Sequence, residues 1–83
     1  MAERALSVIA REIQADWGKK VNYAAKPYLN AMRSLDSIDD NYIYDSGVSV
    51  VAYFLSNASS WRGEKAKEIK AELKGMLKAR KML

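Results

Sequence analysis

The side chains that could do chemistry in this sequence are those of Lys, Arg, Asp, Glu, Tyr and Ser, because the 83 residues include no His and no Cys. This removes the commonest general base and metal ligand, together with thiolate chemistry. No pair among the remaining groups is spaced as an acid and a base, or as a nucleophile and its base. We therefore expect a protein that is not an enzyme and that binds no cofactor and no metal ion.

Lysines near the C-terminus form the most regular pattern of charged groups. Lys67, Lys70, Lys74, Lys78 and Lys81 recur every three or four residues, which places them along one side of a helix. Such a row can follow the phosphates of a nucleic acid or an anionic lipid surface. The alternative is an ordinary solvated helix side, with Lys favoured near the C-terminal end by the helix dipole.

A helix–turn–helix that reads DNA bases is a further possibility for this part of the chain. It would present the following side chains to DNA: Ser59, Ser60, Trp61, Arg62 and Lys65. Against this, three glutamates follow in the same helix at four-residue spacing, where they would repel a phosphate backbone. If nucleic acid is the partner, we expect its phosphates to be held by Arg62, Lys67, Lys70, Lys74 and Lys78.

An acidic loop spans residues 36–47 and contains Asp36, Asp39, Asp40 and Asp45. It lacks the alternating ligand spacing, the central Gly and the terminal Glu of a calcium-binding EF-hand loop. Asp, Asn, Ser and Gly are also the residues that form turns, so turn formation is the simpler interpretation. A patch for a basic partner is the other.

Charge is unevenly distributed along the chain, whose net charge is +4. Residues 34–60 carry four Asp and no Lys or Arg, whereas residues 61–83 carry eight basic and three acidic side chains. Such asymmetry indicates a charged partner. Alternatively, the acidic middle and the basic end attract each other within the fold.

Aromatic residues accompany the acidic loop, and such residues are enriched where proteins bind one another. Tyr42 and Tyr44 lie inside it, whereas Tyr53 and Trp61 are expected to pack in the core. Our first hypothesis is a protein-binding surface made by the loop and the start of the last helix. Its residues would be Asp39, Asp40, Tyr42, Tyr44, Asp45, Trp61 and Arg62.

Helices are the elements that must position these groups. Apolar residues at helical spacing predict four helices, over about residues 3–19, 26–35, 48–58 and 61–80. The predicted fold class is therefore all-α. We expect a compact four-helix single domain over residues 1–83, with one ordered loop between the second and third helices.

Turn-forming residues predict where these helices begin and end. We expect the first helix to stop at Gly18, which tolerates positive φ and is followed by two lysines. Asp45 or Ser46 should cap the third helix, and Ser59 or Ser60 the fourth.

The features that follow carry a resemblance over most of the chain: Pro27-Tyr28-Leu29, Leu35-Asp36-Ser37, Tyr44-Asp45-Ser46-Gly47, Tyr53-Phe54-Leu55 and Trp61-Arg62-Gly63-Glu64. In these features, residues 26–78 resemble a family of small uncharacterised proteins of bacteriophages and prophages. The resemblance implies phage origin and action inside a bacterial cell. It implies no activity and no site residues.

The apolar runs of the sequence indicate where the protein acts. The apolar run at residues 5–10 is short and bounded by charges, unlike a signal peptide, and the run Val50–Leu55 is too short to span a bilayer. We expect a cytoplasmic, non-enzymatic phage accessory protein that binds a host or phage protein. The alternatives are a nucleic-acid-binding protein and a self-associating structural or assembly component.

Overall fold

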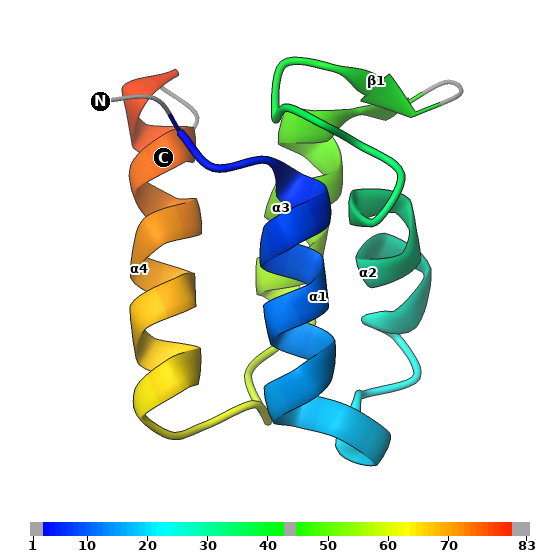
Figure 1. Ribbon diagram of the computed structural model, residues 1–83, viewed down its shortest axis with the longest axis vertical. Coiled ribbons are helices and arrows are strands. Elements are labelled where there is room, and N and C mark those ends of the chain that lie inside the picture. Colours follow the sequence, from blue (N-terminus) through cyan, green and yellow to red (C-terminus); the bar gives the residue numbers. More distant parts are fainter. Residues whose placement is uncertain (1–2, 43–44, 81–83) are drawn as a thin grey trace.

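The computed structural model describes residues 3–42 and 45–80 of the chain. Within them, the chain forms four α-helices and one turn of 3₁₀ helix (Figure 1). Their bounds are α1 Leu6–Trp17, η1 Gly18–Lys20, α2 Lys26–Met32, α3 Gly47–Ser56 and α4 Glu64–Ala79. The prediction of an all-α, four-helix fold is therefore confirmed.

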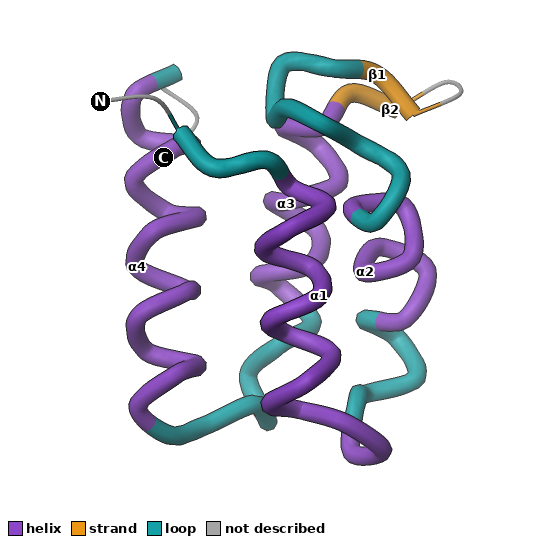
Figure 2. Tube along the Cα trace, viewed as in Figure 1, coloured by secondary structure: helices purple, strands orange, loops and turns teal. Residues whose placement is uncertain are grey.

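The helices form a ring in which each packs on two others. α1 packs on α2 and α4, and α3 packs on the same two helices. Consecutive helices run in opposite directions (Figure 1). We call the end that carries residues 33–42 and 45–46 the loop end, and the opposite end, with residues 18–25 and 57–63, the turn end (Figure 2).

The core is built from the apolar sides that the sequence predicts. On α1, Leu6, Ile9, Ile13 and Trp17 are all buried, and no polar or charged residue is buried within the described part of the chain. α1 ends at Gly18, whose φ of 61° lies in the left-handed region that Gly adopts without steric cost. The predicted stop at Gly18 is confirmed.

A short hairpin orders the acidic loop between α2 and α3. β1 (Asn41–Tyr42) pairs antiparallel with β2 (Asp45–Ser46). Ser46 then caps α3, because its Oγ accepts a hydrogen bond from the Ser49 N–H at 3.1 Å. The expectations of an ordered loop and of a cap at Asp45 or Ser46 are confirmed.

Gly47 lets the start of α3 lie directly against the loop. Its N–H donates to the Asp40 carbonyl at 2.7 Å. A Cβ at this position would lie 2.5 Å from the carbonyl oxygen of Ile38, which is closer than real Cβ atoms approach. Since the side chain of Ile38 is itself buried, the loop cannot move outward without opening the core.

α4 begins later than its sequence signals indicate. Ser59 and Ser60 lie in a turn, and Gly63, with a φ of 111°, directly precedes the first helical residue, Glu64. The prediction of a serine cap is therefore wrong. The physical reason is Trp61, whose ring is buried, so that the chain turns inward at this residue before the helix begins.

The aromatic cluster at the turn end explains that burial. Trp61 stacks on Trp17 with ring centroids 5.6 Å apart, and it lies edge-on to Phe54. Its indole Nε1–H donates to Oδ2 of Asp16 at 2.8 Å. Burying this ring outweighs a local serine cap, which is worth only about 1 kcal/mol.

Tyr53 is the other aromatic residue that was expected in the core, and this prediction is wrong. Its side chain is 53% exposed and stacks on Tyr28 between α2 and α3. Val50 and Phe54, four residues apart, occupy the core side of α3. Tyr53 is turned away from that side by one residue, which is roughly 100° of helix rotation.

Candidate functional site

One side of α4 is acidic and is tied to α1. Glu72 accepts two hydrogen bonds from the Arg4 guanidinium, at 2.7 and 2.9 Å, and Arg4 also pairs with Glu12 of α1. Lys65 of α4 lies 3.4 Å from the same Glu12. The hydrogen bond from Arg4 lowers the pKa of the Glu12 carboxyl below its ordinary value. Two of the charged residues on this side of α4, Glu72 and Lys65, therefore have ion-pair partners inside the protein.

The other side of α4 carries four lysines, which we call the lysine stripe: Lys67, Lys70, Lys74 and Lys78. Lys70 is half-buried and the other three are exposed. At 3.6 residues per turn, Lys70 lies roughly 160° around the helix from Glu72. Because Glu72 faces α1, and α4 also packs on α3, the lysine stripe borders α3. Lys81, which continues the sequence pattern, lies outside the described residues.

Lys70 is the least exposed lysine of the stripe and is repelled by neighbouring cations. Its Nζ donates to the Trp61 carbonyl at 2.6 Å and lies 5.9 Å from the centroid of the Trp61 ring. Burial lowers the pKa of Lys70, and the like charges of Lys74 and Arg62 lower it further. A bound anion would relieve this repulsion among neighbouring cations.

The basic surface continues from the lysine stripe onto the turn end. Arg62 lines one open hollow of about 490 Å³ with Lys67 and Lys70, and the Glu64 carboxylate also lies at this hollow. It also lines a second, of about 460 Å³, with Lys20 and Asp16. The Asp16 carboxylate accepts the Trp61 indole hydrogen bond. Arg62 therefore joins the lysine stripe to η1.

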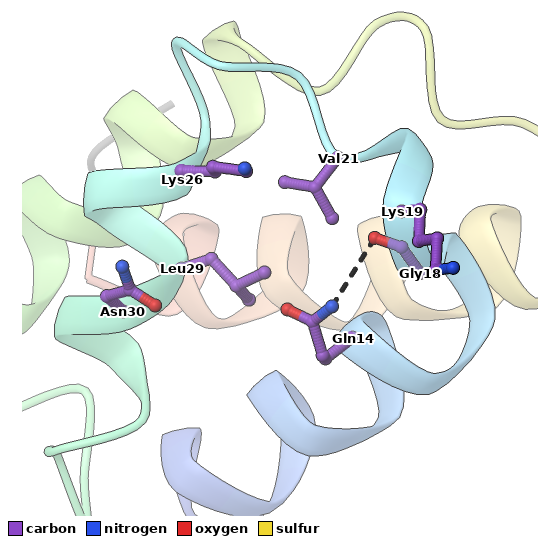
Figure 3. A pocket seen from close by; sticks show the side chains of 7 residues that line it. All are labelled: Gln14, Gly18, Lys19, Val21, Lys26, Leu29 and Asn30. Atoms are coloured by element: carbon purple, nitrogen blue, oxygen red, sulfur yellow. Dashed lines mark hydrogen bonds between the residues drawn. The ribbon is translucent and has the colours of Figure 1, made fainter.

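A third hollow, of about 400 Å³, lies between η1 and α2 and is shown in Figure 3. Lys19 of η1 and Lys26 at the start of α2 lie on opposite sides of it, and the Gln14 amide donates to the Gly18 carbonyl at 3.3 Å. No carboxylate lines this hollow. It extends the positive charge of the turn end toward α2.

Sequence reasoning missed Lys19 and Lys20 as candidate binding residues. The doubled Lys after Gly18 was a visible signal, but it also fits a helix stop. Only the fold brings Lys20 to Arg62, which is far from it in the chain. We call the seven residues together the basic surface: Lys19, Lys20, Arg62, Lys67, Lys70, Lys74 and Lys78.

The cations of the basic surface, unlike several other cations of the protein, form no ion pair within the described residues. Among residues 3–42 and 45–80, the ion pairs involve Arg4, Lys65 and Arg80. None of them involves a residue of the basic surface. The basic surface can therefore hold an anionic partner without first breaking an ion pair.

At the loop end, Arg80 holds three segments together. Its guanidinium donates to both carboxylate oxygens of Glu3, at 2.6 and 2.9 Å, and to both of Asp39, at 2.8 and 2.9 Å. It also donates to the Met76 carbonyl at 2.9 Å. These bonds lower the pKa of the Glu3 and Asp39 carboxyls. The acidic middle and the basic end of the chain thus attract each other within the fold at this point.

The predicted protein-binding surface is not a single surface, so that part of the hypothesis is wrong. Asp45 directly precedes α3, whereas Trp61 and Arg62 follow its other end. The 10 residues of α3 separate the two groups by about 15 Å along the bundle. Trp61 is moreover only 2% exposed, because its ring fills the aromatic cluster, so it offers no contact to a partner. Arg62 is exposed and belongs to the basic surface.

The remaining residues of that hypothesis lie in the acidic loop. Asp40 is exposed, and so is Asp39, although its carboxylate is bound by Arg80. Tyr42 contributes its backbone to β1. Tyr44 lies outside the described residues.

The helix–turn–helix possibility does not match the fold. That motif joins two helices at about 90–120° through a turn of three or four residues. Here α3 and α4 run in opposite directions, and residues 57–63 connect them (Figure 1). Ser59 and Ser60 lie in this connection, outside α4.

Neither a metal-binding cluster nor a membrane-spanning helix occurs among residues 3–42 and 45–80. In that part of the chain, no group of three or more acidic side chains is placed to hold a metal ion. No described helix is both long enough and apolar enough to cross a bilayer. Comparison of the chain with protein-family models, curated proteins and solved structures finds no match.

Proposed function

We propose that the protein is a non-enzymatic nucleic-acid-binding protein that holds its partner through phosphate groups. The observation that carries this proposal is the basic surface, whose cations have no ion-pair partner among the described residues. On the other side of α4, by contrast, Glu72 is already paired with Arg4. A polyanion would supply ion-pair partners for these cations.

The chemistry of the basic surface suits phosphates better than base edges. Six of its seven residues are lysines, which act as point charges rather than as the bidentate donors that recognise guanine. Among the described helices, α3 and α4 run in opposite directions (Figure 1) and do not form the helix–turn–helix geometry that places side chains in the major groove. We therefore expect binding that depends strongly on salt and weakly on nucleotide sequence.

Fluorescence anisotropy of a labelled DNA oligonucleotide at low salt tests this proposal. Lys74→Glu should weaken binding by at least about tenfold, because it replaces an attractive charge at the middle of the lysine stripe. Arg33→Glu is the matched control: it makes the same change of net charge at an exposed residue after α2, away from the basic surface. Absence of binding, or an equal loss in both variants, would refute the proposal.

A second candidate function is supported by the exposed carboxylates of the acidic loop. Asp40 and Asp45 are exposed, and neither forms an ion pair among the described residues. They would suit a basic surface on a host or phage protein. Replacing both by Lys should then abolish co-purification of that protein, whereas Lys74→Glu should leave it unchanged.

The bacteriophage setting and action in the bacterial cytoplasm belong to the same proposal and rest on the sequence resemblance. The test is genomic. A coding sequence embedded among phage structural or replication genes would support the setting, and one embedded among conserved bacterial housekeeping genes would contradict it.

A further inference from the structure

The outward side of α3 is made of small residues. Ser49, Ala52 and Ser56 recur at helical spacing; Ser56 is exposed, and Ser49 and Ala52 are half-buried, with Ala52 packed against the edge of the core. α3 lies between α2 and α4 in the ring, and α1 is on the other side (Figure 2). Short side chains therefore stand along α3 between the two flanking helices, and we call this row of Ser49, Ala52 and Ser56 the strip.

On the α2 side of this strip stands a fixed aromatic pair. The rings of Tyr28 and Tyr53 stack with centroids 5.4 Å apart and 30° between their planes. Tyr53 is nevertheless about half exposed. The stacking holds the Tyr53 ring in one orientation while part of it faces water, as in platforms on which nucleic-acid bases stack.

On the α4 side of the strip stands the lysine stripe. Lys70 is held in place by its hydrogen bond to the Trp61 carbonyl, and Lys74 is exposed one turn further along α4. Axes of packed helices lie ~8–10 Å apart. The lysines and the tyrosine pair are therefore separated by about the width of one helix, which is comparable with the reach from the phosphate of a nucleotide to its base.

We infer that this side of the bundle takes a single strand of nucleic acid, with phosphates on the lysine stripe and bases lying over α3 against Tyr53. The inference rests on the proposed function and names the form of its partner. A duplex offers the lysines the same phosphates, but its bases are stacked inside the helix and cannot reach Tyr53 without being unpaired. The tyrosine pair therefore favours the single strand specifically.

An anionic membrane fits this side less well. Interfacial helices insert large apolar side chains such as Trp, Phe and Leu into the lipid. Beside its small residues, α3 offers one exposed large side chain, Tyr53, whereas Leu55 is half-buried and Phe54 is buried in the core. A membrane partner would give a different outcome. The protein would bind anionic vesicles in competition with a single strand, and Tyr53→Ala would leave the binding to vesicles unchanged.

The experiment compares a single-stranded oligothymidine with a duplex of equal length, by fluorescence anisotropy at one low salt concentration. The unaltered protein should bind the single strand at least about tenfold more tightly. Tyr53→Ala should lower the affinity for the single strand about tenfold, since stacking of one base contributes ~1–3 kcal/mol and 1.4 kcal/mol is tenfold. It should leave the affinity for the duplex unchanged. Tyr53→Phe keeps the ring and should bind like the unaltered protein.

Val8→Ala is the matched control, because Val8 is an exposed apolar residue of α1, across the ring from α3. Amide chemical shifts provide a second readout that needs no variant: oligothymidine should move the signals of Ala52 and Tyr53. If no nucleic acid binds even at low salt, the proposed function fails. If the single strand and the duplex bind equally well and Tyr53→Ala changes neither, only the present inference fails.

Discussion

Gly47→Ala places one methyl group at the most crowded backbone position of the protein. The new Cβ would lie 2.5 Å from the Ile38 carbonyl oxygen, 2.9 Å from its carbon and 3.0 Å from the Asp40 carbonyl oxygen. All three are backbone atoms, which cannot rotate away as a flexible side chain can. The backbone would therefore have to shift, and this shift would also strain the hydrogen bond from the Gly47 N–H to the Asp40 carbonyl.

The expected cost can be estimated from the opposing effects. Forcing extra volume into a packed site typically costs ~1–3 kcal/mol. Exchanging Gly for Ala in a helix recovers up to ~1 kcal/mol. The 2.5 Å approach to a backbone oxygen places Gly47 in the upper part of the first range, ~2–3 kcal/mol, so a recovery of ~1 kcal/mol leaves a net destabilisation of about 1–2 kcal/mol. For a domain of this size, each kcal/mol shifts Tm by ~4–8 °C, so Tm should fall by about 4–16 °C.

Gly75→Ala provides the matched control, because it makes the same chemical change in α4. No atom lies within 4 Å of a Cβ built at Gly75, which is exposed inside the helix. Only the gain in helix propensity applies there, so the variant should be more stable by ~0.5–1 kcal/mol. Thermal unfolding followed by circular dichroism measures both. The same direction of change in both variants, or a neutral Gly47→Ala, would refute the account of the loop contact.

Two further predictions concern the ends of the bundle. Trp61→Ala removes the centre of the aromatic cluster at a cost of ~3–5 kcal/mol, which equals the typical stability of so small a domain, so a large fraction of the variant should be unfolded and its far-ultraviolet circular dichroism should show a marked loss of helix; a variant as helical as the unaltered protein would contradict the assigned burial. At the other end, Arg80 lowers the pKa of Glu3 and Asp39 in the folded state. Their contribution to stability is therefore present above the ordinary pKa of these carboxyls, near pH 4, and is lost as the pH falls through the lowered values. Arg80→Gln should reduce the loss of stability between pH 5 and about pH 2 in urea titrations, and an unchanged pH profile would contradict the role of Arg80 in holding Glu3 and Asp39.

Helix number, the core side of α1 and the Ser46 cap were accessible from the sequence because each depends on neighbours within one or two turns. The start of α4 was not. Its local signal, Ser59 and Ser60, was overridden by the burial of Trp61 against Trp17. The tertiary packing of one large ring outweighed a favourable cap. The spacing of apolar residues within the segment does not indicate this packing, because the partner ring lies in another helix.

The candidate site was predictable in part for a related reason. The lysine stripe depends only on helical spacing, whereas its extension to Lys20 depends on how the turn end brings η1 to Arg62. The separation of Asp45 from Trp61 was in fact accessible from the sequence, since a helix between them necessarily sets them apart by its length. The partners of Arg4 and Arg80 could not be predicted from the sequence, because both side chains pair with residues distant in the chain.

The salt dependence of DNA binding tests the central claim most directly. For a protein that neutralises several phosphates, the logarithm of the association constant falls linearly with the logarithm of the salt concentration, with a slope of about −0.9 per phosphate contacted on duplex DNA. We predict a slope of about −3 to −5 for the unaltered protein, and a slope about one unit smaller in magnitude for Lys74→Gln. A slope near zero, or a slope that Lys74→Gln leaves unchanged while Arg33→Gln reduces it, would contradict the assignment of the basic surface as the binding site.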